Sequence, residues 1–278
     1  MLALVLLPSR ASPLIGTFVL TKLEATLYAL THRGNPGDRE FYAKACAPGQ
    51  RVLELGSGYG RLMVDFVAAA KRSAPAPRYF GLEQEPQLLA LARRTLSVLT
   101  PAQRQQVRLV QGNMCNFELG REFDRIILPY NGLYCLLNHR DILRCLRCVK
   151  RHLAPGGEFL FDVWAANRFH RDANGEEYHD DPGAILAIAS GANMWSVFEK
   201  SRLRSRLQRL DVTYTYVSPQ RGRCVTIPIA QRYACSSELV DLLSRAGLHV
   251  KAKYGTFTKR QFQPQSSHLI VRAGLMSP

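Results

Sequence analysis

The segment Val52–Arg61, VLELGSGYGR, limits the possible folds more than any other part of the chain. It passes from a short apolar stretch into three glycines at alternate positions, Gly56, Gly58 and Gly60, and a helical pattern, LMVDFVAAAK, follows. Glycines let the backbone turn tightly and approach a ligand, and the free N–H groups of the next helical turn act as donors beside it. The segment therefore predicts a strand, a glycine loop and a helix that together bind a nucleotide-like ligand.

The spacing of the glycines distinguishes two ligand classes. The dinucleotide fingerprint G-x-G-x-x-G would place its third glycine at position 61, which is Arg61, and this argues against a nicotinamide oxidoreductase. Glu54 stands two residues before Gly56, where a carboxylate suits an amino group and would repel a pyrophosphate. In this pattern the chain resembles the class I S-adenosylmethionine-dependent methyltransferases. The resemblance implies S-adenosylmethionine as cofactor, with loop contacts from Glu54, Gly56, Ser57, Gly58 and Gly60.

Two later strand ends extend the expected cofactor site. RYFGLEQEP reads as the second strand, and Glu83 closes it about twenty residues beyond the glycine loop, where a carboxylate can accept hydrogen bonds from two ribose hydroxyls. Gln84 follows it. The third strand, VRLVQG, leads to Asn113 where the family generally has an aspartate; its side chain can still accept from the adenine amino group. Met114 is expected to pack on the adenine ring.

The fourth strand, FDRIIL at 123–128, ends beside the expected position of the transferable methyl group. It continues into Pro129, Tyr130 and Asn131, and a bacterial branch of the family reads proline, aromatic, asparagine at this place. The order differs from the N-P-P-Y of base-amino DNA methyltransferases, which argues against a nucleobase substrate. We assign Leu128 and Pro129 to the cofactor and Tyr130 and Asn131 to the methyl acceptor. A structural core role for Tyr130 stays open.

The N-terminal segment LYALTHRGNPGDREFY resembles the helices that precede the first strand in the same branch. A tyrosine and a histidine stand near the cofactor mouth there, and the matching residues are Tyr28 and His32. The branch usually has an acidic residue after the tyrosine, where this chain has Ala29. We assign Tyr28 to the cofactor and His32 as a candidate base, and simple packing is an equally good interpretation of both.

Helix and strand patterns alternate five times up to Asp162, the end of the strand EFLFDV, which predicts a parallel sheet covered on both faces. We add Asp162 to the candidates that orient the acceptor. Residues 165–193 then show no strong period, whereas LQRLDVTYTYV and CVTIPIAQRYA alternate across an SPQRG turn and predict a hairpin. We expect its Tyr214 and Tyr216 to influence substrate choice; packing or a dimer contact is the alternative.

The resemblance covers roughly residues 25–273 and implies an α/β fold with a doubly wound, seven-stranded, Rossmann-like sheet, its last strand antiparallel, and an antiparallel lid insertion after strand 5. The expected organisation is an N-terminal helical segment at 1–45, a cofactor-binding core at 46–164, a substrate lid at 165–233, and a C-terminal helix and strands at 234–278 that complete the core.

Composition narrows the cellular setting and the partners. The chain has 278 residues and a net charge of +15, with its basic residues dispersed, so a solvated basic face is favoured while an RNA or peptide partner stays open. No apolar run approaches a membrane span, and MLALVLLPSR lacks a basic start, so we expect a cytoplasmic protein. Seven cysteines do not suggest a disulfide framework, and Cys145 and Cys148 lie in a helical pattern typical of ordinary thiols, not of a metal site.

These observations predict an S-adenosylmethionine-dependent methyltransferase that modifies an N or O nucleophile of a small metabolite or natural product. The alternatives are a peptide, protein or RNA methyltransferase that uses the basic surface, and a protein that binds S-adenosylmethionine without catalysis. A homodimer is compatible with the sequence.

Overall fold

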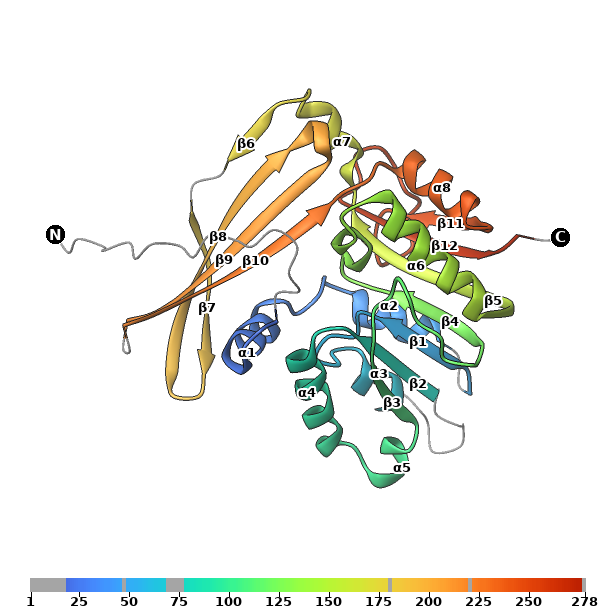
Figure 1. Cartoon of the computed structure of the whole chain (residues 1–278), viewed down its shortest axis with the longest axis horizontal. Coiled ribbons are helices and arrows are strands. Elements are labelled where there is room, and N and C mark those ends of the chain that lie inside the picture. Colours follow the sequence, from blue (N-terminus) through green and yellow to red (C-terminus); the bar gives the residue numbers. More distant parts are fainter. Residues whose placement is uncertain (1–18, 47–48, 69–77, 180–181, 220–221, 277–278) are drawn as a thin grey trace.

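The computed structural model describes residues 19–46, 49–68, 78–179, 182–219 and 222–276. Figure 1 shows two sheets, one covered by helices and one long, twisted and antiparallel that extends away from it. We call them the central sheet and the insertion sheet. Within the described ranges, no helix is long and apolar enough to cross a membrane.

The central sheet has seven strands in the order β11-β12-β5-β4-β1-β2-β3. Strands β1 to β5 pair in parallel, and β12 is antiparallel to both β5 and β11. This confirms the predicted seven-stranded sheet with an antiparallel last strand. The strands are β1 (Arg51–Leu55), β2 (Arg78–Glu83), β3 (Val107–Gln111), β4 (Phe123–Leu128), β5 (Leu153–Trp164), β11 (Leu248–Tyr254) and β12 (His268–Leu275).

Helices cover both faces of this sheet, because its strands are apolar on both sides. One buried cluster contains the apolar stripes of α6 and α8, and a second contains residues of α2 and α3. Cys145 and Cys148 of α6 are buried in the first cluster as free thiols. The helices are α1 (Lys22–Thr31), α2 (Asp38–Ala45), α3 (Met63–Ala68), α4 (Pro86–Thr95), α5 (Pro101–Arg104), α6 (His139–His152), α7 (Ala166–Asp172) and α8 (Ser236–Arg245), with short 3₁₀ turns η1 (Leu96–Val98), η2 (Gly132–Cys135) and η3 (Ser205–Leu207).

The insertion sheet follows β5, as predicted. It contains β6 (Glu177–His179), β7 (Gly183–Ser190), β8 (Asn193–Arg204), β9 (Arg209–Ser218) and β10 (Arg223–Arg232), in the order β10-β9-β8-β6 with β7 also paired to β8. The predicted hairpin is β9–β10, in which Tyr214 pairs with Ile227. None of β6, β7 and β8 was predicted from the sequence. In β7 most residues are exposed, so the alternation of buried and exposed residues is missing.

Helix α1 joins the two parts. A capping box formed by Thr21 and Glu24 begins it, and its buried Ala25 and Leu27 pack in one cluster with Leu88 of α4 and with the insertion sheet. The insertion sheet contributes the fully buried Tyr216 to this cluster, together with Trp195, Val197, Ile188 and Ile227. The inner face of the insertion sheet is therefore a packing surface for α1.

Candidate active site

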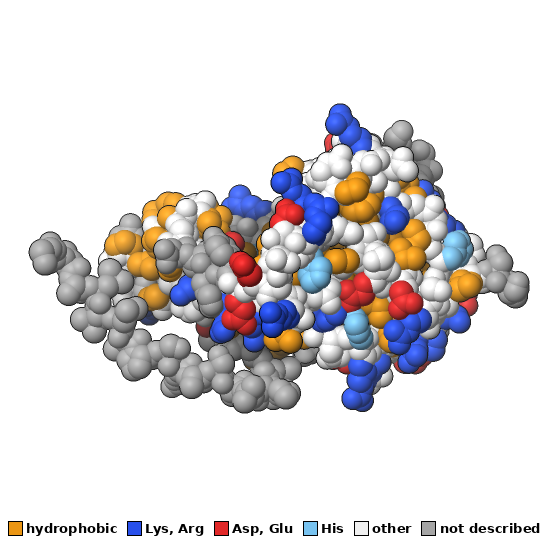
Figure 2. Space-filling view, turned by 90° about the horizontal axis from the view of Figure 1, so that it is seen from above, with side chains coloured by type: hydrophobic (Ala, Val, Ile, Leu, Met, Phe, Trp, Pro, Cys, Tyr) orange, Lys and Arg blue, Asp and Glu red, His pale blue; other side chains and the backbone are white. Residues whose placement is uncertain are grey.

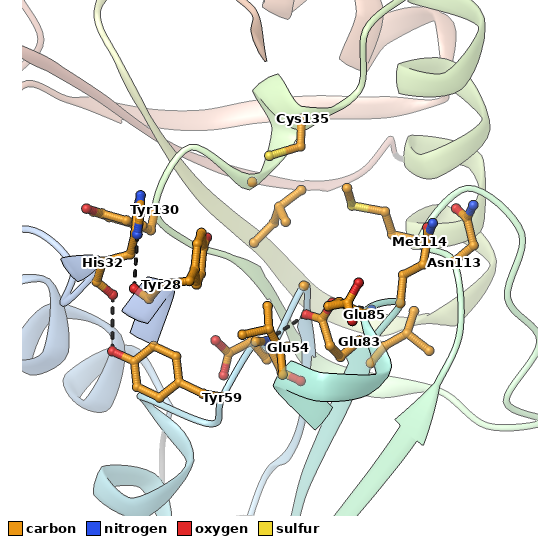
Figure 3. A pocket seen from close by; sticks show the side chains of 18 of the residues that line it. Tyr28, His32, Glu54, Tyr59, Glu83, Glu85, Asn113, Met114, Tyr130 and Cys135 are labelled. Atoms are coloured by element: carbon orange, nitrogen blue, oxygen red, sulfur yellow. Dashed lines mark hydrogen bonds between the residues drawn. The ribbon is translucent and has the colours of Figure 1, made fainter. Parts of the chain in front are cut away.

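A cavity of about 730 Å³ lies at the carboxyl ends of β1, β2 and β4. Figure 3 shows it from close by, with Tyr28, His32 and Tyr130 at one end, Asn113 and Met114 at the other, and Glu54 and Glu83 between them. Open α/β sheets bind ligands at this edge. Of the predicted residues, the cavity is lined by Tyr28, His32, Glu54, Gly56, Ser57, Gly58, Glu83, Gln84, Asn113, Met114, Leu128, Pro129 and Tyr130.

The glycine loop turns directly under the cavity. Gly56, Gly58 and Gly60 have φ values of 63°, 55° and 79°, a region that other residues rarely adopt. Gly60 does not line the cavity, which corrects our expectation of a cofactor contact. A Cβ atom at Gly60 would lie 3.1 Å from the Met63 side chain and 3.3 Å from that of Ala92, so this glycine permits close packing of the loop against α3 and α4.

Glu83 is held by the backbone around it. One carboxylate oxygen accepts a hydrogen bond from the Gly58 N–H at 2.7 Å, and the other accepts from the Glu85 N–H at 2.8 Å. Burial raises the pKa of Glu83, while the Glu85 and Gly58 N–H groups act in the opposite direction. Each oxygen keeps a second lone pair, so a buried carboxylate with fixed orientation can still accept from a pair of ligand hydroxyls.

Glu54 lies deeper in the same wall, and it is buried. Its carboxylate accepts a hydrogen bond from the Tyr79 hydroxyl on the neighbouring strand. Burial raises the pKa of Glu54 to about 8, against the effect of that hydrogen bond. A cationic ligand group beside Glu54 would favour the ionised form of this carboxyl group.

Asn113 stands at the opposite end, directly after β3. Its Oδ1 accepts the Cys115 N–H at 2.8 Å, which fixes the orientation of the amide. The NH₂ group of the same side chain takes no part in this hydrogen bond. The NH₂ group can donate to a ring nitrogen, and Oδ1 keeps a second lone pair that can accept from an adenine amino group, so the predicted contact stays a prediction.

Three rings meet at the other end of the cavity. The rings of Tyr28 and His32 are stacked, with centroids 4.0 Å apart, and Tyr130 meets His32 edge-on at 6.3 Å. Tyr214 from β9 also meets His32 edge-on, at 4.8 Å. The predicted N-terminal and β4 residues are thus brought together, and the insertion sheet contacts them through Tyr214.

His32 lines this end of the cavity, and one of its two ring nitrogens has no hydrogen-bond partner in the described structure. Its Nδ1 lies 3.0 Å from the Tyr28 carbonyl oxygen, which can only accept, so Nδ1 carries the hydrogen. Nε2 is buried and has no hydrogen-bond partner in the described structure. Burial lowers the pKa of His32 to about 4, against the effect of the Tyr28 carbonyl, so the imidazole is neutral at neutral pH. Nε2 is therefore a buried hydrogen-bond acceptor that has no donor, whereas most buried polar atoms have a partner.

Asn131 and Asp162 lie behind the cavity wall and do not line it. Asp162 is fully buried and accepts hydrogen bonds from the Tyr42 hydroxyl and the Tyr130 N–H. The Asn131 side chain accepts the Trp164 N–H at 2.7 Å. We predicted that both residues orient the acceptor, but neither lines the cavity, and the Asp162 carboxylate and Asn131 Oδ1 are bound to other parts of the protein.

The residues that form one wall of the cavity were not predicted from the sequence. It is formed by Ile227, Pro228 and Ile229 of β10, and by Cys135 and Leu136 at the end of η2. β10 is the edge strand of the insertion sheet, and a proline inside a strand pattern is a signal for an edge. Pro228 could therefore have identified the strand that borders the site. Tyr214 and Tyr216, which we had expected to govern substrate choice, are not among the lining residues.

Charged side chains are dispersed over the face of the molecule that Figure 2 shows. Figure 2 shows lysine and arginine side chains scattered over the visible face among acidic, polar and apolar ones. Arg61, beside the cavity, is bound by both nitrogens to Asp38 at 2.9 and 2.7 Å. Its charge is thus already paired, and no group of three potential metal ligands occurs in the described ranges.

The chain matches a known protein family in its central part. Residues 52–157 match the family model described as a methyltransferase domain. This segment contains the glycine loop, Glu83, Asn113 and the turn after β4, all of which line the cavity.

Sequence and structure comparisons give relatives of low identity. The chain is 23% identical over 201 residues, 71% of its length, to a dTDP-3-amino-3,6-dideoxy-alpha-D-glucopyranose N,N-dimethyltransferase of Streptomyces fradiae, and the match spans 65% of that enzyme. The fold is similar to that of the CcbJ methyltransferase from Streptomyces caelestis (TM-score 0.72, 21% identity, 88% of this chain and 91% of that one). It is also similar to an S-adenosylmethionine-dependent methyltransferase from Clostridium acetobutylicum (TM-score 0.70, 15% identity, 91% and 98%).

Proposed function

We propose that this chain, a member of the S-adenosylmethionine-dependent methyltransferases, transfers a methyl group to the amine nitrogen of a small natural product, such as an amino sugar. The domain match and the fold support the membership. The choice of an amine is supported by the Streptomyces fradiae relative, which is an N,N-dimethyltransferase of an amino sugar. The observation that carries the proposal is the unpartnered, neutral His32 Nε2 at the end of the cavity that lies away from Asn113.

The residues of the cavity fit S-adenosylmethionine along its length. Glu83 would accept from the ribose hydroxyls, and Asn113 and Met114 would contact the adenine. Glu54 and the backbone of the glycine loop would hold the amino acid end, where a buried carboxylate suits an ammonium group. When bound, the cofactor supplies an activated methyl group on a sulfonium, so the protein mainly has to align the acceptor and exclude water.

His32 would act on the acceptor amine. An amine attacks through its nitrogen lone pair, so it must be bound unprotonated. A neutral imidazole nitrogen can accept a hydrogen bond from an N–H group of such an amine. The lowered pKa of His32 keeps Nε2 an acceptor at every pH above about 4. Once the amine nitrogen has accepted the methyl group it would carry a positive charge, and its proton would leave to solvent. A group with a pKa of about 4 takes up little of that proton, so the role of His32 Nε2 would be to orient the amine through its N–H group.

The insertion sheet would serve as the lid over this end. Ile227 to Ile229 border the cavity with apolar side chains, and Tyr214 contacts the His32 ring. An apolar boundary here would exclude water from the methyl group during transfer. A small, enclosed acceptor agrees with a cavity of about 730 Å³ that must also hold the cofactor.

The proposal can be tested in two steps. Calorimetry should show binding of S-adenosylmethionine and S-adenosylhomocysteine, and binding of NADH in their place would overturn it. Methyl transfer is then measured as S-adenosylhomocysteine formation with a panel of amino sugars and the matching hydroxyl sugars. Turnover of amines and not of their hydroxyl analogues is expected.

His32→Ala should lower kcat on the best amine about a hundredfold, the size expected when the group that orients the nucleophile is lost. His249→Ala on β11 is the matched control, because His249 is exposed and does not line the cavity. Equal rates in the two variants would remove His32 from the mechanism. Cofactor binding without turnover of any panel member would favour the non-catalytic alternative.

A further inference from the structure

The backbone turns in an unusual way directly after β4. Tyr130 and Asn131 have φ values of 55° and 62°, so two successive residues other than glycine adopt the left-handed conformation. Such residues rarely enter this region, and they stay there only where the surroundings hold them. The turn brings Tyr130 to the cavity, beside His32.

The end of β5 holds this turn through three hydrogen bonds. The Tyr130 N–H donates to Asp162 Oδ1 at 2.9 Å, and the Asn131 N–H donates to the Asp162 carbonyl oxygen at 3.1 Å. The Trp164 N–H donates to Asn131 Oδ1 at 2.7 Å. Asp162 therefore contributes both its side chain and its backbone to the position of Tyr130.

The same carboxylate reaches two other elements. The Tyr42 hydroxyl of α2 donates to Asp162 Oδ1 at 2.6 Å, and Asn35 Nδ2 donates to Asp162 Oδ2 at 3.3 Å. Asn35 lies three residues after His32, in the segment that joins α1 to α2. One fully buried side chain thus connects the turn that carries Tyr130 with the segment that follows His32.

We propose that Asp162 is a positioning residue, which fixes Tyr130 and the His32 segment relative to each other and thereby sets the geometry of the acceptor end of the cavity. This inference rests on the proposed function of that end. Asp162 does not touch the acceptor; it acts through the Tyr130 backbone and through Asn35.

The ionised form of Asp162 suits this arrangement, because all three side-chain contacts are donors to it. Burial raises the pKa of Asp162 to about 6, while the Tyr42 hydroxyl and the Tyr130 N–H oppose the rise. The paired Asp38 and Arg61 nearby act in opposite directions, Asp38 raising and Arg61 lowering this pKa. In Asp162→Asn, the side chain keeps one acceptor oxygen, but its NH₂ group then faces a donor in place of the second oxygen, and that hydrogen bond is lost.

Asp162→Asn is therefore the informative variant, and Asp124→Asn is its control. Asp124 is also an aspartate of the central sheet, but it bonds Arg51 at the amino end of β4, away from the cavity. Fluorine NMR of protein labelled with 3-fluorotyrosine reports on Tyr130, whose resonance is assigned with Tyr130→Phe. We expect Asp162→Asn to shift or broaden this resonance and Asp124→Asn to leave it unchanged.

Kinetics on the amine identified above separate positioning from stability. Asp162→Asn should lower kcat about ten- to a hundredfold and raise KM for the amine, with the Kd for S-adenosylmethionine changed less than about threefold. Tyr42→Phe and Asn35→Ala each remove one contact and should have smaller effects in the same direction. If Asp162→Asn does not fold, these two variants carry the test.

An unchanged Tyr130 resonance, or a kcat no lower than that of Asp124→Asn, would overturn the inference. Loss of cofactor affinity in parallel with kcat would do the same, because it would indicate general damage to the site. The fluorine measurement needs no acceptor, so it tests Asp162 even if no amine is methylated and the proposed function fails.

Discussion

The two walls of the cavity are built on different principles. On the central-sheet side, polar side chains stand at strand ends and are oriented by neighbouring groups: Glu83 by two backbone N–H groups, Asn113 by one, and Glu54 by a tyrosine hydroxyl. On the insertion-sheet side, the buried face packs on α1, and the edge of β10 borders the cavity with apolar residues. The first wall can fix the orientation of a polar cofactor, and the second can bound an acceptor.

The difference has a topological cause. The carboxyl ends of parallel strands converge on one edge of a sheet, so residues far apart in sequence, such as Glu54, Glu83 and Asn113, meet there. An antiparallel sheet instead presents a broad face, and here that face is covered by a helix. Substitutions on the two sides should therefore damage different properties, cofactor affinity on one and folding stability on the other.

The largest expected effect is on the insertion sheet. Tyr216 is fully buried against α1, so Tyr216→Ala should lower the free energy of unfolding by about 3 to 5 kcal/mol, the range for removal of a buried aromatic side chain. This replaces the expectation from the sequence that Tyr216 acts on substrate choice. Chemical denaturation measures this free energy. The control is Thr226→Ala, an exposed position on β10, which should change the free energy of unfolding by no more than about 0.5 kcal/mol. A stability loss below 1 kcal/mol would show that the inner face is not a packing surface.

On the central-sheet side, Glu83→Ala should mainly change binding. Loss of hydrogen bonds to a charged group costs roughly 1.5 to 3 kcal/mol, so the Kd for S-adenosylmethionine should rise about ten- to a hundredfold. Calorimetry gives the Kd. Glu85→Ala is the comparison variant, because it removes the second carboxylate that lines this part of the cavity, together with the side-chain cap of α4. A larger effect at Glu85 would move the ribose contact to that residue.

The raised pKa of Glu54 predicts that the protein releases a proton when S-adenosylmethionine binds. Its pKa of about 8 leaves most molecules protonated at pH 7, and a bound ammonium group would lower that pKa and expel the proton. Calorimetry at pH 7 in buffers of different ionisation enthalpy should detect a release of up to about one proton in the unmodified protein. Glu54→Gln should abolish most of it. Equal release in both would place the amino group elsewhere.

The smallest effect is expected at Asn113, where the structure sharpens the prediction from the sequence. If the free NH₂ group donates to an adenine ring nitrogen, Asn113→Asp should weaken cofactor binding a few-fold, and Asn113→Leu should weaken it similarly or more. If the side chain instead accepts from the adenine amino group, Asn113→Asp should preserve or tighten binding. The sign of the change for Asp separates the two contacts.

Much of the fold was predictable from local patterns. The five parallel strands and the glycine loop have short-range signals, and the order of the strands along the chain predicts the central sheet; the regular alternation with helices fails only between β3 and β4, where the described structure has no helix. Contacts at the ends of elements are not visible in such patterns: the N–H of Ser236, the first residue of α8, donates to Asn167 Oδ1, which lies 69 residues earlier in the chain. The exposed strand β7 had no alternation to reveal it.

The amino-acid sequence by itself determined which residue types stand at the carboxyl ends of β1, β2 and β3, because a motif of fixed spacing and the alternation of elements place them there. It did not determine the partners of buried polar groups. Asp162 and Asn131 appeared as acceptor-facing residues, and only the tertiary structure directed them to the Tyr130 turn, Tyr42 and the Trp164 N–H. The packing of α1 likewise decided that Tyr216 is buried and that the β10 edge borders the cavity, since contacts between segments more than a hundred residues apart leave no local pattern in the chain.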